Sequence, residues 1–242
     1  MEVLSELVYK TLDDRKLRAV IDTLGHTDFM SGGWIAGGAA RKAWYNLDWS
    51  DQDVDYFFAN EQQYQSFNES IESKSKKYEV EFGIPSTIDN GIWSGAHTAT
   101  TTAVELKPIK SVTCYSTDNA NTYTFSDIEL AAGTYDITDD THSLKIQAIK
   151  KYYPSSLREL FATFDFTVCQ FATDGKILVA TKAAIEDCDL NRLVMVPDTP
   201  RKATALRILK YATYGFNPSD NMMSDALNRL VNNEEDMIND QY

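Results

Sequence analysis

The sequence predicts an α+β protein in which a mixed β-sheet with flanking helices is followed by a small helical domain. Before residue 183, several segments alternate polar with β-branched or aromatic residues, as strands do. Asp174 and Gly175 separate two of these segments and are typical of a hairpin turn. After residue 183, apolar residues recur at helical spacing in three stretches. We therefore expect a first domain over residues 1–182 and a helical domain over residues 183–242, which ends in an acidic tail.

The first part of the chain predicts helices and strands in alternation. Apolar residues at helical spacing indicate a helix over residues 3–24. "GWIAGG" predicts a short apolar strand that closes on a glycine turn, "AARKAWYNL" a helix, and "DVDYFFA" the next strand. Residues 60–77 show weak helical periodicity. Residues 82–102 are rich in Gly, Ser, Thr and Pro, which predicts a long surface loop.

The same two periodicities predict the remaining elements. Strands are expected over residues 103–116, 121–130 and 142–149, and a hairpin over residues 164–181. Helices are expected over residues 154–164, 183–196, 199–216 and 221–233. Pro154 precedes the first of these helices with Ser155 or Ser156 as its N-cap, and Gly215 ends the third.

Composition excludes several classes of protein. The formal net charge is −13 and the pI is near 4.6, so the chain lacks the large basic surface of a general nucleic-acid binder. No apolar run approaches the length of a membrane-spanning helix, and we expect no membrane association. The N-terminus has no signal-peptide pattern, and the three cysteines are far apart in the sequence, which predicts a reducing cytoplasm.

Two aspartates, Asp53 and Asp55, lie at the start of a predicted buried strand. Residues at positions i and i+2 of a strand point to the same face, so the two carboxylates lie side by side. Two unpaired carboxylates at that separation repel each other, and burial raises the pKa. A divalent cation resolves this conflict, because Mg²⁺ prefers carboxylate oxygens and leaves positions open for substrate phosphates. Two such ions suit in-line displacement at phosphorus.

The residues between the two predicted strands favour phosphate binding. Gly37 and Gly38 follow a strand and precede a helix, so the backbone can approach a triphosphate and offer N–H groups at a helix N-terminus. Arg41, one turn into that helix, can reach a phosphate as a planar donor. The order strand, glycine pair, helix, aspartate pair and strand is more specific than any of its parts.

The segment "GGAARKAWYNLDWSDQDVDYF" resembles the first motif of the DNA polymerase β-like nucleotidyltransferase superfamily, in which a GG or GS turn precedes Dx[DE]. Its GGxxR form is most similar to the head of class II tRNA nucleotidyltransferases and bacterial poly(A) polymerases. By this resemblance the first domain is a nucleotidyltransferase-type head and residues 183–242 are the helical neck that follows it. Segments 116–125 and 144–166 are also similar to nucleotidyltransferase-like proteins of phages and large viruses.

Two downstream segments extend the resemblance. "FDFTVCQFATDGKIL" (164–178) is similar to the family's second motif, which implies that Asp165 contacts the nucleotide sugar or, as in more distant members, acts as a third metal ligand. "LNRLVMVPDTPRKATALRILKYATYGF" (190–216) resembles the neck, and implies that Arg207 and Lys210, one helical turn apart, contact the nucleotide.

The resemblance implies an Mg²⁺-dependent nucleotidyltransferase that moves a nucleotidyl group from ATP or another NTP to an acceptor hydroxyl. The acceptor is an RNA 3′ end, as in RNA processing, a protein or a small molecule. Asp53, Asp55 and Asp165 are the expected catalytic residues, and the first two would hold two metal ions. The nucleotide-binding residues are expected to be Gly37, Gly38, Arg41, Asp165, Arg207 and Lys210. The expected location is the cytoplasm, and the host cytoplasm if the protein is viral.

A second hypothesis stays open. Thr163 and Phe164 stand where the family has two arginines, and Ala203 and Thr204 stand where an acidic pair contacts the incoming base. The net charge of −13 also disfavours a long RNA partner. These departures favour a catalytically reduced binding or assembly protein of viral origin, which keeps the fold without the transfer reaction.

Overall fold

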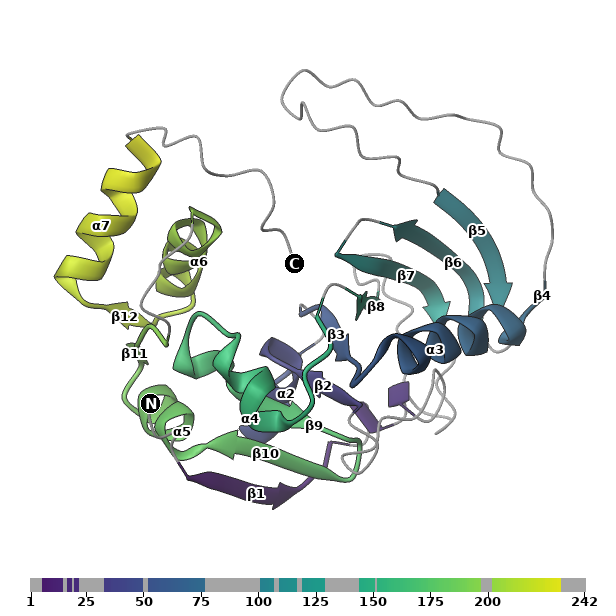
Figure 1. Ribbon diagram of the computed structural model, residues 1–242, viewed down its shortest axis with the longest axis horizontal. Coiled ribbons are helices and arrows are strands. Elements are labelled where there is room, and N and C mark those ends of the chain that lie inside the picture. The colour runs from purple at the N-terminus through teal and green to yellow at the C-terminus, as the bar shows by residue number, and fades with distance from the viewer. Residues whose placement is uncertain are drawn as a thin grey trace.

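The computed structural model describes residues 6–14, 17–18, 20–21, 33–49, 52–76, 101–106, 109–116, 119–128, 144–150, 152–196 and 202–231 (Figure 1). Most of the predicted loop at residues 82–102 lies outside these ranges, and only its last two residues are described, within a strand. Within the described residues, no helix is both long and apolar enough to cross a membrane.

The fold is α+β, with a mixed sheet flanked by helices, as the sequence predicts. The sheet order is β1-β10-β9-β2-β3-β8-β7-β6-β5-β4. β3 pairs with β8 in parallel, and the other named pairs of this sheet are antiparallel. The strands are β1 (Leu7–Thr11), β2 (Trp34–Ala36), β3 (Val54–Phe57), β4 (Ser75–Lys76), β5 (Thr101–Leu106), β6 (Ile109–Ser116), β7 (Ala120–Ile128), β8 (Leu144–Ile149), β9 (Phe171–Thr173) and β10 (Ile177–Thr181).

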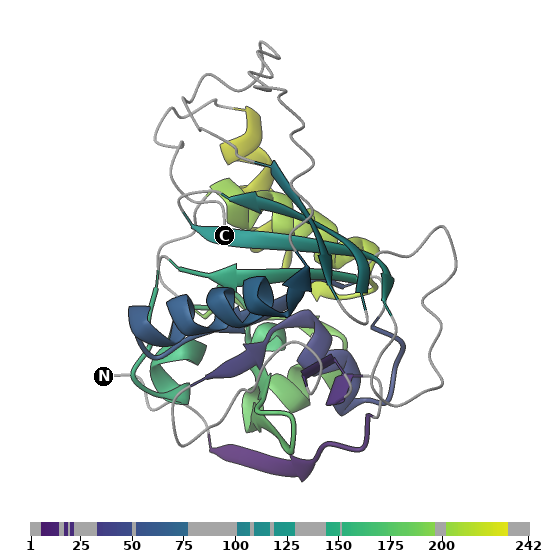
Figure 2. The same cartoon turned by 90° about the vertical axis from the view of Figure 1, so that its right-hand side faces the viewer.

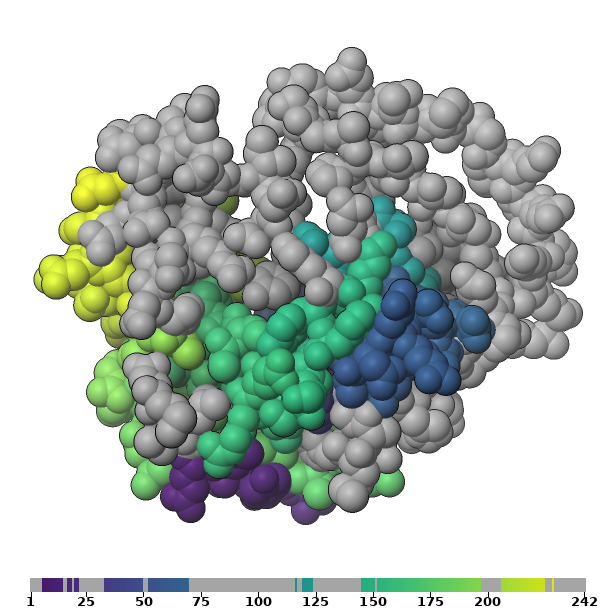
Figure 3. All heavy atoms as spheres, in the orientation of Figure 1, coloured from purple at the N-terminus to yellow at the C-terminus, as the bar shows by residue number. Residues whose placement is uncertain are grey.

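Helices cover the two faces of this sheet. They are α2 (Gly38–Trp44), α3 (Glu61–Lys74), α4 (Leu157–Ala162), η1 (Thr167–Cys169), α5 (Lys182–Asp189), α6 (Lys202–Thr213) and α7 (Asp220–Val231). A short parallel pair, β11 (Arg192–Leu193) with β12 (Asn217–Pro218), brings the segments before α6 and before α7 together. α3 runs alongside the strands in both ribbon views (Figures 1 and 2). In Figure 1, α6 and α7 lie together on the opposite side of the molecule from α3. In the space-filling view α7 lies at the surface (Figure 3).

Alternation along the central strands separates two cores. On one face, Tyr56 of β3 and Ile146 of β8 pack with Phe67 of α3. On the other face, Trp34 and Ala36 of β2 and Phe57 pack in a cluster that includes residues of α4, η1 and α6. Asp55 is two residues from Phe57 and therefore belongs to the face that α6 approaches.

The predicted N-terminal helix is wrong over Leu7–Thr11, which form β1. This strand pairs antiparallel with β10, from Leu7 opposite Thr181 to Thr11 opposite Ile177. The spacing of apolar residues favours a helix locally, but β10 has an edge whose backbone groups need partners, and β1 supplies them. Residues 17, 18, 20 and 21 are helical, so the prediction is confirmed at these positions, and residues 22–24 lie outside the described residues.

Two further boundaries differ from those expected. The helix predicted over residues 183–196 ends at Asp189 because Asn191 adopts φ 50°, a left-handed conformation that asparagine tolerates at helix ends. The strand predicted from residue 164 begins only at Phe171, because Thr167–Cys169 form a 3₁₀ turn. The hairpin itself is confirmed, since Gly175 has φ 92° between β9 and β10.

Other local predictions are confirmed. Ser156 is the N-cap of α4, and its hydroxyl accepts a hydrogen bond from the backbone N–H of Glu159. Gly215, with φ 89°, follows the end of α6. The strands expected over residues 103–116, 121–130 and 142–149 correspond to β5 with β6, to β7 and to β8. Thr101 and Thr102, which the sequence places at the end of a loop, belong instead to β5.

Candidate functional site

Asp53 and Asp55 lie at the centre of the sheet. Asp55 is the second residue of β3, where its neighbours are Ala36 of β2 and Gln147 of β8. Asp53 directly precedes the strand. The two carboxylates therefore project from one edge of β3 toward the same face, as their spacing predicts.

Two side chains of β8, which the sequence analysis did not single out, contact Asp53. Lys145 Nζ lies 3.2 Å from Asp53 Oδ2, and Gln147 Nε2 donates to the same oxygen at 3.3 Å. The available signal was the pattern of "HSLKIQAI", in which two polar residues at positions i and i+2 share one strand face. Local alternation could show that they share a face, but not that this face adjoins Asp53.

The environment of Asp55 disfavours its ionised form. Burial, and then the neighbouring charge of Asp53, raise the pKa of Asp55 to about 7, although the positive charges of Arg207, Lys145 and Lys210 act to lower it. The residue is only partly buried as a whole, but its Oδ1 is shielded from solvent and has no hydrogen-bond partner among the described residues. Asp55 therefore carries a buried oxygen that a cation or a proton would satisfy.

Gly37 connects β2 to α2 directly beside Asp55. Its φ of 88° and ψ of −136° are accessible to glycine but strained for other residues. A Cβ on Gly37 would lie 3.6 Å from Asp55 Oδ2, so the turn and the carboxylate are in contact distance. The N–H of Gly37 donates to the carbonyl of Phe171 at 2.9 Å, and it is therefore already used within the fold.

Gly38 also has a close neighbour. An added Cβ would come within 2.5 Å of Gln52 Oε1, the far end of a flexible side chain. The backbone conformation at this position does not require glycine. A larger residue would only need the Gln52 side chain to move aside.

Arg41 of α2 is buried against aromatic residues at the end of α6. Its guanidinium lies 5.4 Å from the ring centre of Tyr211 and 5.0 Å from that of Phe216. Nη1 has no hydrogen-bond partner among the described residues. The structure thus places Arg41 against aromatic rings at the end of α6, with one donor available.

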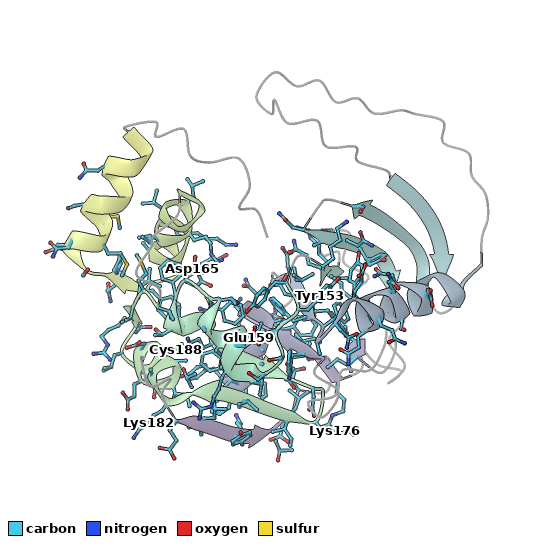
Figure 4. All side chains as sticks on the ribbon, in the orientation of Figure 1. Tyr153, Glu159, Asp165, Lys176, Lys182 and Cys188 are labelled. Atoms are coloured by element: carbon cyan, nitrogen blue, oxygen red, sulfur yellow. The ribbon has the colours of Figure 1, made fainter. Side chains whose placement is uncertain are left out.

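Asp165 and Arg207 are brought together. Asp165 Oδ1 lies 3.2 Å from Arg207 Nη2, and Asp165 is labelled beside α6 in Figure 4. Arg207 Nη2 also lies 3.5 Å from Cys169 Sγ, which in turn lies 3.0 Å from the hydroxyl of Tyr211. Burial raises the pKa of the Cys169 thiol and keeps it neutral. These contacts join η1 and its preceding segment to α6.

Lys210 differs from Arg207 although the two are one helical turn apart. Its side chain is exposed, and Nζ lies 5.8 Å from the ring centre of Tyr214. Its charge nevertheless contributes to the pKa of Asp55, so α6 directs positive charge toward the carboxylate pair.

The carboxylate pair fits a hard divalent ion. Its oxygens are the ligand type that Mg²⁺ prefers, and Asp55 Oδ1 is a buried acceptor with no partner in the described part of the chain. In that same part, no three His, Cys, Asp or Glu residues are grouped as a metal site, so a bound ion would depend on further ligands from substrate or water.

Three solved structures of CCA-adding enzymes are similar to the chain. The enzyme from Thermotoga maritima complexed with tRNA matches with a TM-score of 0.46 and 11% identity, over 92% of this chain and 46% of that one. A CCA-adding enzyme in complex with CTP matches with a TM-score of 0.46 and 13% identity, over 93% of this chain and 45% of that one. An apo form matches with a TM-score of 0.45 and 12% identity, over 93% of this chain and 46% of that one. The chain thus spans about half the length of these proteins, and a likeness at this level carries no information on activity.

No curated protein matches the chain. A family model does, under the description Gad2, Gabija anti-defense 2 family protein, and it matches residues 11–190. That segment is 180 of the 242 residues and includes the glycine turn, the carboxylate pair, both β8 side chains and Asp165. The chain belongs to the Gad2 family of Gabija anti-defense proteins.

Proposed function

We propose that the protein is a metal-dependent nucleotidyltransferase, and that it acts against the Gabija defence named in the description of its family. The observation that carries the proposal is the placement of Asp53 and Asp55 on one face of β3 beside the Gly37 turn. A buried carboxylate oxygen without a partner, next to a second carboxylate, is an arrangement that a divalent ion satisfies.

In the proposed reaction, the acceptor hydroxyl oxygen forms a bond to the α-phosphorus of an NTP and the bond to the β-phosphate breaks. Pyrophosphate leaves, and the hydroxyl proton passes to solvent. When bound, Mg²⁺ would neutralise triphosphate charge and favour the ionised acceptor. Asp53 and Asp55 would hold the metal, and the segment from Gly37 to Arg41 would lie along the phosphates.

Residues of α6 would hold the nucleotide from the other side. Lys210 is exposed and its charge acts on Asp55, which supports a contact between Lys210 and a phosphate. Arg207 and Asp165 form an ion pair, and this pair would orient the sugar or base. The net charge of −13 disfavours a long RNA, so a protein or small-molecule hydroxyl is the acceptor that we favour.

Transfer of label from each of the four α-³²P-labelled NTPs tests the proposal directly. The purified protein is incubated with Mg²⁺ and with extracts of cells that do and do not contain a Gabija system, and labelled products are separated by size. We expect label transfer by the wild type and none by Asp53→Asn with Asp55→Asn. Asp13→Asn is the matched control, because Asp13 is an exposed aspartate in the segment after β1. Equal transfer by the double variant would exclude the proposed catalytic residues.

A second candidate function is binding without transfer. It is favoured by the contacts of three expected nucleotide-binding residues: Arg41 lies against aromatic rings, and Asp165 and Arg207 pair with each other. Thermal unfolding with each NTP, with and without Mg²⁺, separates the candidates. A ligand at 100 times its Kd stabilises the folded state by about 2.7 kcal/mol. Stabilisation that requires both NTP and metal supports the enzyme, and its absence supports the binding protein.

A further inference from the structure

Lys145 is placed on β8 at the level of Asp53. The parallel register sets Val54 beside Ile146 and Asp55 beside Gln147, so Lys145 shares the face of the carboxylate pair. Its Nζ lies 3.2 Å from Asp53 Oδ2. Gln147 donates to the same oxygen at 3.3 Å, and that oxygen therefore has two protein donors.

The two carboxylates are unequally satisfied. Asp53 Oδ2 has an ammonium and an amide beside it, whereas Asp55 Oδ1 is buried and has no partner among the described residues. An ion bound to Asp53 Oδ2 at a normal magnesium–oxygen distance would lie beside the Lys145 ammonium and be repelled by it. An ion at Asp55 meets no such neighbour on its own oxygen.

Stability does not account for the Lys145–Asp53 pair. The side chains are 42% and 41% exposed, and ion pairs at that exposure contribute little to the free energy of unfolding. The small number of metal ligands also favours a single ion at the carboxylate pair. The described residues contain no third His, Cys, Asp or Glu grouped with these two as a metal site, and two divalent ions would share a small ligand set.

We propose that the Lys145 ammonium takes the place of one of the two metal ions beside the paired carboxylates, so that the site takes a single divalent ion with its nucleotide. This inference rests on the proposed nucleotidyl-transfer site and specifies its metal content. It replaces the two ions expected from the sequence by one ion near Asp55 and one ammonium at Asp53. Lys145 is thus a positioning residue that compensates the charge of Asp53, and Gln147 holds the same carboxylate by a neutral hydrogen bond.

Equilibrium dialysis of the full chain tests this stoichiometry without turnover. The probes are Mn²⁺ and the α,β-methylene analogues of the four NTPs, in which the bond broken in the reaction is blocked. Bound Mn²⁺ is measured by electron paramagnetic resonance, and bound nucleotide by absorbance. We expect one Mn²⁺ per bound nucleotide in the wild type and two in Lys145→Met, because Asp53 then lacks its counter-charge.

Two variants serve as controls. Lys145→Arg keeps the positive charge and should keep one ion per nucleotide. Lys150→Met removes a lysine that follows β8 and contacts Ser116 instead of the carboxylates, and it should also keep one. Thermal unfolding in EDTA verifies that each variant is folded, and Lys145→Gln replaces Lys145→Met if the latter is not.

The outcomes distinguish the role of Lys145 from the proposed transfer reaction. Two ions per nucleotide in the wild type would overturn the role of Lys145 and leave the proposed function standing. One ion or none in the folded Lys145→Met or Lys145→Gln variant would also overturn it. Failure of the wild type to bind any of the analogues with Mn²⁺ would instead overturn the proposed function itself.

Discussion

The carboxylate of Asp165 pairs with the guanidinium of Arg207 at 3.2 Å, and this contact joins the segment before η1 to the middle of α6. Both side chains are mostly buried, at 13% and 31% exposure. Breaking a buried pair leaves one charge uncompensated, whereas removing both charges costs less.

We therefore expect Arg207→Met to lower the free energy of unfolding by about 2 kcal/mol, below the full value for a buried pair because Arg207 retains some exposure. Asp165→Asn should cost a similar amount, and the double variant less than the sum of the two. Urea unfolding of the four proteins gives the coupling energy. Strict additivity would contradict an energetic link between the two residues.

The raised pKa of Asp55 predicts that the metal-free protein loses stability as the pH rises. The pKa is about 7 in the folded chain, because of burial and then Asp53, against an ordinary aspartate value of 3.8. Between these values the folded state binds more protons than the unfolded state, so the free energy of unfolding falls from about pH 4 to about pH 7. Above pH 7 the loss is complete.

Asp55→Asn should remove this component, and the variant should be more stable than the wild type at pH 8 in EDTA. Urea unfolding at pH 5 and pH 8 measures the difference for both proteins. Other groups titrate in the same range, so the quantity compared is the change in the free energy of unfolding between pH 5 and pH 8 in each protein. Equal changes in wild type and variant would show that Asp55 is ionised at low pH in the folded chain.

Arg41 is expected to stabilise the packing of α2 on the residues that end α6. Its guanidinium contacts the rings of Tyr211 and Phe216, and its stem is buried. Arg41→Ala should lower the free energy of unfolding by about 2 kcal/mol, through lost cation–π contact and lost packing. Differential scanning calorimetry should show a decrease in Tm of roughly 4–8 °C.

Arg41→Lys is the matched comparison, since it keeps the charge but not the planar group. It should recover only part of the loss. Complete recovery by lysine would indicate that the charge alone matters at this position.

Gly37→Ala should destabilise the chain and also weaken nucleotide binding. The residue has φ 88°, and its Cβ would face Asp55 Oδ2 at 3.6 Å. The backbone strain costs about 1–3 kcal/mol. Gly215→Ala is the control, because φ is 89° there and no atom lies within 4 Å of its added Cβ.

Both alanine variants should therefore lose stability, but only Gly37→Ala should lose Mn²⁺-dependent binding of the nucleotide analogues. Thermal unfolding and equilibrium dialysis measure the two effects. Equal binding by Gly37→Ala and Gly215→Ala would contradict a nucleotide site at the Gly37 turn.

Much of the local structure could be predicted from the sequence. A left-handed residue after a helix, a short hairpin turn and an N-cap depend on a few consecutive residues, and the sequence indicates Gly215, Asp174 with Gly175, and Ser156 on that basis. The orientation of the aspartate pair can also be predicted locally, because strand geometry alone sets Asp53 and Asp55 on one face.

Long-range pairing could not be predicted in the same way. The apolar spacing of residues 7–11 predicts a helix and not β1, because the partner strand of β1 begins at Ile177, far along the chain. The role of Asn191 was overlooked because helical periodicity continues beyond it in the sequence, although its φ of 50° ends α5.

The sequence by itself determined the local order of strand, glycine turn, helix and aspartate pair, since each depends on neighbouring residues and on their side-chain period. Only the tertiary structure decided what surrounds that pair. The parallel register of β3 with β8 sets Lys145 beside Asp53, and the packing of α6 sets Arg207 against Asp165. These contacts join residues that are distant in the chain, and their formation depends on strand register and burial, which local periodicity does not encode.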